Sequence, residues 1–306
     1  MRLTSALTHT FSFFPGNYRW SAEMLTTLSA AQYGGADVSE VLRIGTSLRD
    51  QVGNDEAWFD TWIKAAHLRI STAQAAEADE HPLTAASHYL RACFYAQIVD
   101  HARQPKDEIA LAEYQKSLDC FRKFAALTNR PKIAVVELPS KAGSFPAYFV
   151  HAKNTSGRAP CVVRFGGFDT QKELQYLCGV PDMVRRGLSH LLVDGPGQRE
   201  AIRFRGMPMR YDFDVAGSAA LDYLQTRNGV DMMRVAILAM SLGGYCALRG
   251  DGHTLQRVHR VGRDLGLSSH PGQAYQGAEG RRAAGASRTS AVGNRRRDLR
   301  RSAEKT

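Results

Sequence analysis

The sequence predicts an α/β protein in which an all-helical N-terminal domain precedes a doubly wound, mostly parallel sheet that is incomplete. Two changes in the pattern of apolar residues along the chain predict this fold class. Apolar residues recur at helical spacing from about residue 20 to residue 128, and after "NRPK" at 129–132 they gather in short β-rich runs. From about residue 249 apolar residues become scarce. We therefore expect a helical domain at 1–130, a sheet domain at 131–249 and a disordered basic tail at 250–306.

Turn residues divide the helical domain, and acidic residues are placed to start its helices. Breaks are expected at Gly34-Gly35, at "EHP" (80–82) and at "RQP" (103–105), with Asp37 and Asp107 as N-caps. Large side chains at helical spacing should form the core of this domain, and they include Trp58, Trp62, Tyr89 and Phe94. We expect the domain to act as a lid over the carboxyl ends of the strands.

Short apolar runs rich in β-branched residues predict the strands of the second domain. These runs are "IAVVEL" (133–138), "AYFVH" (147–151), "CVVRF" (161–165), "HLLVD" (190–194) and "VAILA" (235–239). Amphipathic stretches near 171–186 and 211–227 separate the last three runs, which is typical of parallel βαβ units with right-handed crossovers. In such sheets function gathers where the strands end at their carboxyl edge.

Three of the predicted strands are followed by motifs that could carry chemistry. "GGFD" (166–169) allows a tight turn whose backbone N–H groups can face an oxyanion, and "DGPGQ" (194–198) is a stiff turn with a structural role. "AMSLGG" (239–244) places Ser241 in the strand-turn-helix pattern of a nucleophile elbow, which needs small residues two positions before and after the serine. Ala239 and Gly243 meet that need. Taken alone, a serine beside glycines is also compatible with an ordinary strand-to-helix turn.

The order of "FGGFDTQKE", "DGPGQRE" and "AMSLGGY" resembles the α/β-hydrolase fold, and within it the branch that carries an N-terminal helical domain. That branch includes 2,6-dihydropseudooxynicotine hydrolases, fungal polyketide-shortening hydrolases of pigment synthesis, and esterases similar to the fermentation–respiration switch protein. The resemblance runs from about residue 11 to residue 248. It implies Ser241 as nucleophile, the N–H of Leu242 as one oxyanion donor, and the N–H of Phe168, or alternatively Gly167, as the other. Ala239 departs from the glycine usual in the elbow.

The charge of the chain is concentrated in the tail. The net charge is +10, and residues 250–306 carry +7 of it. Apart from Tyr275, the tail has no aromatic residue among its arginines, so it lacks a stacking platform for bases. We therefore do not expect nucleic acid as the main partner, although phosphate binding by the arginines remains the basis of an alternative function.

Other features exclude several classes of protein. The first twenty residues hold no uninterrupted apolar core, which argues against a signal peptide or membrane span and favours a cytoplasmic location. The five cysteines have no paired spacing, so we expect reduced thiols and neither a metal site nor a cofactor. The expected partner is a small carbonyl substrate, and a homodimer is left open.

The acid and histidine that would activate Ser241 are the missing part of the pattern. In this fold both follow the nucleophile on loops after later strands. In this chain, however, the amino-acid composition changes abruptly after about Arg249 to one rich in Arg, Gly, Ala and Ser. Out-of-frame reading of a GC-rich gene would produce such a change, and a divergent tail is the alternative. The tail contains several candidates, which a disordered segment could not hold beside Ser241: His253, His259, His270, Asp251, Asp264 and Asp298.

Two functions from different classes follow from these observations. The first is a serine hydrolase that cleaves an ester, or a C–C bond beside a ketone, and whose activity is impaired by loss of the acid and the histidine. The second is a non-catalytic truncated product whose basic tail binds nucleic acid or acidic partners.

Overall fold

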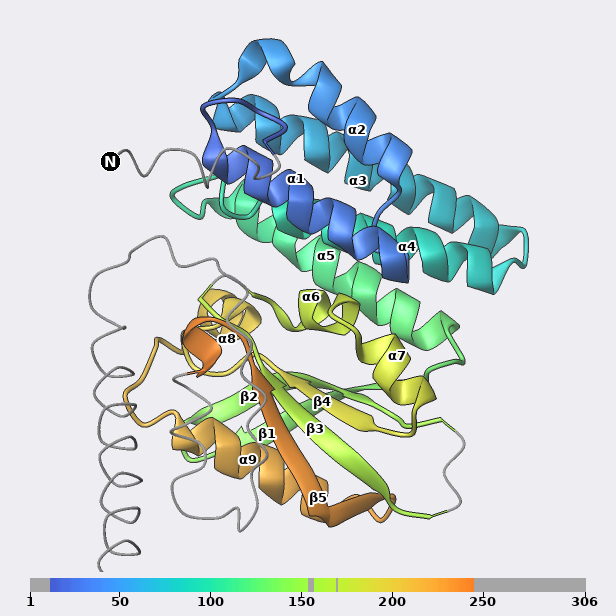
Figure 1. The fold of residues 1–306 in the computed structure, drawn as a ribbon, viewed down its shortest axis with the longest axis vertical. Helices are drawn as coiled ribbons and strands as arrows, with labels where there is room; N and C mark the ends of the chain where they lie inside the picture. The colour runs from blue at the N-terminus through green and yellow to red at the C-terminus, as the bar shows by residue number, and fades with distance from the viewer. Residues whose placement is uncertain (1–11, 154–156, 169, 245–306) are drawn as a thin grey trace, which may run out of the picture. The chain divides into compact units, whose positions relative to one another are not determined.

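The helices of the N-terminal part form a layer of their own. The computed structural model describes residues 12–153, 157–168 and 170–244, and the predicted tail at 250–306 lies outside these residues. The layer is made of α1 (Tyr18–Ala30), η1 (Ala31–Tyr33), α2 (Val38–Ser47), η2 (Arg49–Gln51), α3 (Asp55–Ala78), α4 (Pro82–Ile98) and α5 (Glu108–Leu127) (Figure 1).

Side-chain caps explain where these helices begin. The carboxylate of Asp37 accepts hydrogen bonds from the N–H groups of Ser39 and Glu40 at the start of α2. Asp107 accepts from the N–H of Ala110 at the start of α5, and Pro82 occupies the first turn of α4, where no N–H is needed. Both predicted N-caps are therefore confirmed.

An aromatic core holds the helical layer together. Trp20, Trp58 and Trp62 are fully buried, with ring centroids 4.6 Å apart between the first two and 5.7 Å apart between the last two. Tyr95 packs edge-on against Trp62 at 5.3 Å. The predicted core residues Trp58, Trp62, Tyr89 and Phe94 are all at most 4% exposed. Side chains of this size dominate the energetics of a core.

The second part of the chain forms a sheet of five strands in the order β1-β2-β4-β3-β5. The strands are β1 (Ile133–Ser140), β2 (Gly143–Val150), β3 (Ala159–Phe165), β4 (Ser189–Val193) and β5 (Val230–Ala239). Only β2 runs against the others, because it pairs antiparallel with β1 and β4 while β3 pairs parallel with β4 and β5. The predicted, mostly parallel sheet is confirmed. Among the described residues β5 pairs on one side only.

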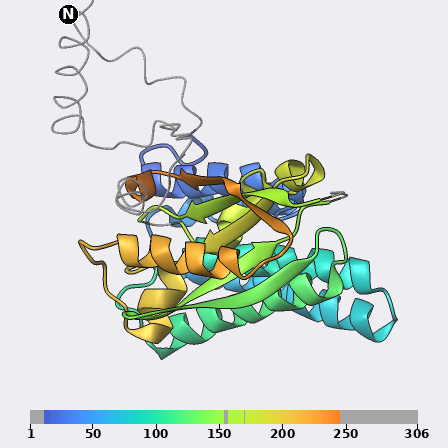
Figure 2. The same ribbon diagram turned by 90° about the horizontal axis from the view of Figure 1, so that it is seen from below.

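Helices cover both faces of this sheet. On β2, Tyr148 and Val150 join the apolar cluster of the helical layer, whereas the alternating Ala147 and Phe149 join the cluster formed with α9 (Asp214–Gln225). Figures 1 and 2 show α9 on one face, and α6 (Lys172–Leu177) and α7 (Val180–Arg185) between the other face and the helical layer. This is the doubly wound arrangement that the sequence predicts.

Two local features differ from the expected elements. The amphipathic stretch near 171–186 forms two short helices instead of one, because Gly179 between them has a positive φ of 86°. The turn at 194–198 leads into an unpredicted helix, α8 (Arg199–Arg205).

A buried ion cluster lies where β4 ends. The Lys172 ammonium lies 3.1 Å from Asp194, 3.0 Å from Glu173 and 2.6 Å from Glu200, and all four side chains are at most 5% exposed. Asp194 also accepts hydrogen bonds from the backbone N–H groups of Lys172 and Glu200, at the starts of α6 and α8. The cluster therefore fixes both helices to the end of β4, and we call it the Lys172 cluster.

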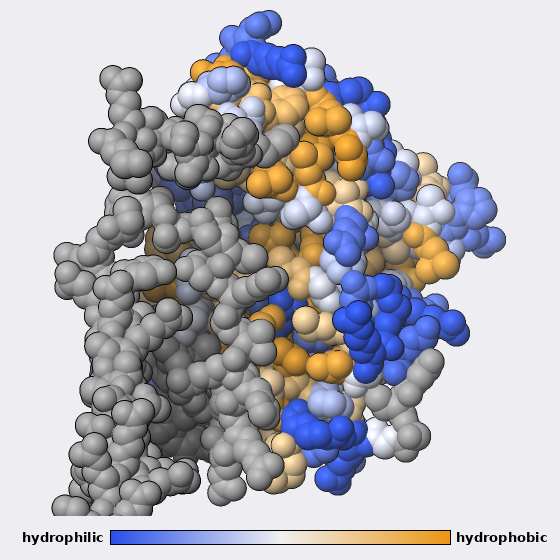
Figure 3. Space-filling model, in the orientation of Figure 1, coloured by the Kyte–Doolittle hydropathy of each residue, from blue (hydrophilic) through white to orange (hydrophobic). Residues whose placement is uncertain are grey.

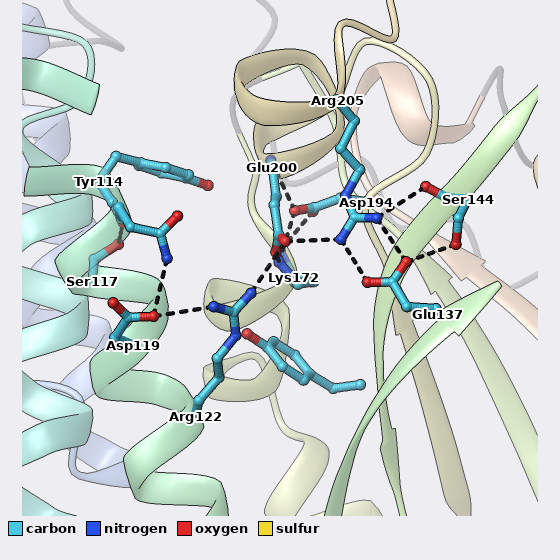
Figure 4. Close-up of polar contacts among 12 residues, drawn as sticks. Tyr114, Ser117, Asp119, Arg122, Glu137, Ser144, Lys172, Asp194, Glu200 and Arg205 are labelled. Carbon is cyan, nitrogen blue, oxygen red and sulfur yellow. Dashed lines mark hydrogen bonds and ion pairs between the residues drawn. The ribbon is translucent and has the colours of Figure 1, made fainter. Parts of the chain in front are cut away.

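The Lys172 cluster also connects the helical layer to the sheet. Arg122 of α5 reaches Glu200 at 3.3 Å, and Arg205 of α8 bridges Glu200 and Glu137 of β1 (Figure 4). The amide of Gln97 at the end of α4 donates to Glu173 at 3.1 Å. Side chains of α4 and α5 thus pair with or donate to the buried carboxylates of Glu173 and Glu200.

A second ion group joins the same two layers. Asp100, just after α4, pairs with both Arg199 and Arg203 of α8. Because α8 follows the carboxyl end of β4, these pairs place the end of α4 on the carboxyl side of the parallel strands.

Titration within the Lys172 cluster follows from its burial. Burial raises the pKa of Asp194 to about 6, with the neighbouring carboxylates of Glu173 and Glu200 adding to the effect and Lys172 opposing it. Burial alone would lower the pKa of Lys172, but the carboxylates of Asp194, Glu173 and Glu200 raise it well above its usual value. Lys172 therefore remains charged in the folded chain.

Asp194 should make the stability of the fold depend on pH. Its folded pKa of about 6 lies above the usual 3.8, so the folded chain binds this proton more tightly than the unfolded chain. The resulting stability is complete below the unfolded pKa and is lost as the pH rises through the folded value. Relative to Asp194→Asn, the wild-type free energy of unfolding should fall by about 2 to 3 kcal/mol between pH 4 and pH 7, measured by urea denaturation.

The control for this prediction is Asp60→Asn, an exposed aspartate of α3 outside the Lys172 cluster. That variant should keep the wild-type pH slope. Parallel pH profiles for wild type and Asp194→Asn would contradict the assigned titration.

Candidate active site

Ser241 lies in a strained turn directly after β5. Its φ is +54°, a conformation that side chains other than glycine rarely adopt. The N–H groups of Gly243 and Gly244 donate to the carbonyls of Met240 and Ser241, both at 2.9 Å, and residues 242–244 are helical. The side chain of Ser241 is exposed. This is the local geometry of a strand-to-helix elbow.

Glycines allow the turn after β3 to approach this elbow closely. A Cβ atom on Gly243 would lie only 2.4 Å from the carbonyl oxygen of Gly166. A Cβ on Gly167 would lie 3.0 Å from Ser241 Cβ and 3.6 Å from Ser241 Oγ. The backbone of Gly167 is therefore a direct neighbour of the serine, and any larger residue at position 243 would push the two turns apart.

Gln198 connects the third motif to the same place. Its side-chain amide is buried, donates to the carbonyl oxygen of Gly166 and accepts the N–H of Gly195 at 2.7 Å. The "DGPGQ" turn is thus joined to the glycine turn after β3 through the carbonyl of Gly166. A structural role for this motif is predicted from the sequence, but the role of Gln198 is not. The available signal is a polar residue directly after Gly195-Pro196-Gly197.

Two of the residues that carry the predicted oxyanion donors are exposed at the surface. The side chain of Phe168 is 71% exposed and that of Leu242 is 39% exposed. Within the part of the chain that the structure describes, no hydrogen bond is formed by the N–H groups of Gly167, Phe168 or Leu242. Backbone donors without a partner beside a serine are suited to bind a developing negative charge.

No base or acid contacts the serine among the described residues. Ser241 Oγ makes no hydrogen bond to a His, Asp or Glu side chain in that part of the chain. The tail candidates His253, His259 and His270, together with Asp251, Asp264 and Asp298, lie outside it. In the same residues, no group of three or more His, Cys, Asp or Glu side chains is arranged to hold a metal ion.

Four of the cysteines are free thiols, and Cys246 lies outside the described residues. Over the described ranges, no helix is both long and apolar enough to cross a membrane.

Comparisons with known proteins agree with this fold. Residues 39–269 match the family model described as Esterase FrsA-like. Hydrolase LUC6 of Fusarium sp is 31% identical over 77% of this chain and 58% of its own length. Hydrolase pyiE of Pyricularia grisea is 33% identical, with 78% and 56% covered. The 20-hydroxy-prefusarin hydrolase FUS2 of Gibberella moniliformis is 30% identical, with 74% and 56% covered.

A solved structure gives the same result for the fold. The crystal structure of 2,6-dihydroxy-pseudo-oxynicotine hydrolase superposes with a TM-score of 0.61 at 23% identity, over 72% of this chain and 60% of that one. The chain thus spans 56 to 60% of the length of these relatives. Since the family model spans most of the chain, the chain belongs to the FrsA-like esterase family of α/β-hydrolases.

Proposed function

We propose that this chain carries the nucleophile and oxyanion hole of a serine hydrolase that acts on a carbonyl compound. The observation that carries the proposal is the approach of Gly167 to Ser241, whose φ of +54° presents the hydroxyl at the carboxyl edge of the sheet. The N–H of Leu242 and that of Phe168, or alternatively Gly167, would bind the oxyanion.

The proposed reaction proceeds through a covalent intermediate. Ser241 Oγ adds to the substrate carbonyl and gives its proton to a base, and the negative charge develops on the carbonyl oxygen. When the tetrahedral intermediate collapses, the carbonyl forms again and the bond from its carbon to the leaving group breaks. The leaving group is the alkoxide of an ester, or the carbon beside a ketone, and it takes up the proton from the base. Water then releases the acyl group. The proposed substrate is therefore an ester, or a compound with a cleavable C–C bond beside a ketone. This agrees with the hydrolase names of the relatives.

The helical layer is the proposed lid. The pairs of Asp100 with Arg199 and Arg203 attach the end of α4 to the helix that follows β4. A layer held on that side of the sheet could exclude water from the carbonyl and select the substrate. The base is the open part of the proposal. Without one, we expect slow acylation and little turnover.

A fluorophosphonate probe should label this chain at Ser241. The serine oxygen displaces fluoride and forms a bond to phosphorus, which requires a nucleophile and an oxyanion hole but no complete cycle. Mass spectrometry of the labelled peptide should find the adduct on Ser241, and Ser241→Ala should abolish it. Ser218→Ala, an exposed serine on α9, is the matched control and should label as the wild type does. Equal labelling of Ser241→Ala would refute the assignment.

Gly243→Ala should separate the elbow from the glycine turn. The added methyl would lie 2.4 Å from the Gly166 carbonyl oxygen, so one turn must move away from the other. We expect labelling of Ser241 to slow by roughly 10 to 100-fold, the range that follows from small misplacements of catalytic groups. Gly244→Ala is the control, because a Cβ at that position meets no atom within 4 Å. Equal rates for the two variants would count against the proposed geometry.

A further inference from the structure

A hollow at the opposite edge of the sheet from Ser241 has no place in the proposed reaction. It has a volume of about 520 Å³, and its lining comes from the link between α5 and β1, the segment after β2, and α7. Because β1 begins there and the antiparallel β2 ends there, the hollow lies at the amino ends of the parallel strands. We call it the amino-end pocket.

Basic side chains dominate the lining of the amino-end pocket. It includes Arg130, Lys132, His151, Lys153 and Arg185, and no Asp or Glu. Arg185 pairs with Asp182, whereas none of the other four forms an ion pair within the described residues. Hydrophilic side chains gather over α7 in the space-filling view (Figure 3). Charges of one sign around a concave surface reinforce one another and attract an oppositely charged ligand.

Backbone hydrogen bonds hold the basic segments in place. The N–H of His151 donates to the carbonyl of Lys132 at 3.0 Å, and the N–H of Lys153 donates to the carbonyl of Val184 at 3.2 Å. The three segments of the lining are therefore joined directly, and the ligand need not bring them together. Preformed sites lose less conformational entropy on binding.

The pocket also has an apolar side and a half-buried histidine, His151. Tyr176, Pro181 and Val184 contribute the apolar part of the lining. Burial lowers the pKa of His151, with help from the positive charges of Lys132 and Arg227. Arg227 belongs to a neighbouring hollow of about 390 Å³ that shares His151 and has no acidic side chain in its lining. The positive field thus extends past the pocket itself.

We propose that the amino-end pocket binds a small organic phosphate. The phosphate contacts Arg130, Lys132 and Lys153, and the organic part lies against Tyr176 and Pro181. Arginine matches two phosphate oxygens at once, and lysine adds point charges. Arg130, Lys132 and Lys153 form no ion pair among the described residues, and a dianionic phosphate balances three such cations better than a monoanionic carboxylate does. This assignment does not depend on the role of Ser241.

Isothermal titration of the full chain with phenyl phosphate and with pyrophosphate tests the proposal. In 150 mM NaCl we expect saturable binding of one phenyl phosphate per chain, and Arg130→Ser/Lys132→Ser should weaken it at least tenfold. The matched control is Arg43→Ser/Lys141→Ser, which removes the same two charges from exposed positions that form no ion pair in the described part of the chain, and it should bind as the wild type does. Pyrophosphate should bind at the same place and compete.

Two further outcomes keep the test decisive. Lys153→Ser, after β2, should weaken binding at least threefold, which gives a second measurement if the double variant fails to fold. Undiminished binding in Arg130→Ser/Lys132→Ser would show that other arginines of the chain capture the anion, and would overturn the proposal. The same conclusion would follow from equal losses in the control, or from no saturable binding by the wild type.

Discussion

A buried lysine surrounded by carboxylates holds the helical layer and the sheet together. Lys172 is 1% exposed, and an unpaired charge at such a place would cost several kcal/mol. Its partners come from two segments: Glu173 from the first turn of α6, like Lys172 itself, and Asp194 and Glu200 from the stretch that runs from the end of β4 into α8. The carboxylates exceed the single ammonium in charge, so they need further donors. The helical layer supplies Arg122 and Gln97. The buried carboxylates therefore have enough hydrogen-bond donors and positive charge only when the helical layer is packed on the sheet.

The same constraint brings the candidate active site together. Asp194 holds the first residues of α6 and α8, and these helices follow the turns that contain Gly166 and Gln198. Gln198 then donates to the Gly166 carbonyl, and Gly243 lies close to the same oxygen. The proposed nucleophile and oxyanion donors thus meet at a place that buried charges have fixed beforehand. Rigid support of this kind is what transition-state stabilisation requires.

Local sequence patterns were enough to predict much of the fold. The features that depend on charge pairs between distant residues were not predicted. Strand and helix positions follow from apolar periodicity, and the caps Asp37 and Asp107 act within one turn of the chain. The elbow at Ser241 has a local signature as well. By contrast, Lys172 and Glu200 have the residue types of solvated loops, and only their pairing across 28 residues makes burial favourable. The same non-local pairing explains why α8 was not predicted, whereas the break between α6 and α7 comes from the left-handed conformation of Gly179.

Hydrogen exchange of Lys172→Met, compared with the wild type, tests most directly whether the Lys172 cluster couples the two layers. Loss of the ammonium leaves carboxylates buried without their shared partner, so we predict faster exchange in three separate segments: α5, 166–177 and 194–205. Lys123→Met, which removes an exposed lysine of α5, should leave those rates unchanged. A change confined to α6, with α5 and the turn at 194–198 as protected as before, would contradict the claim that this cluster holds the helical layer and the candidate site in place.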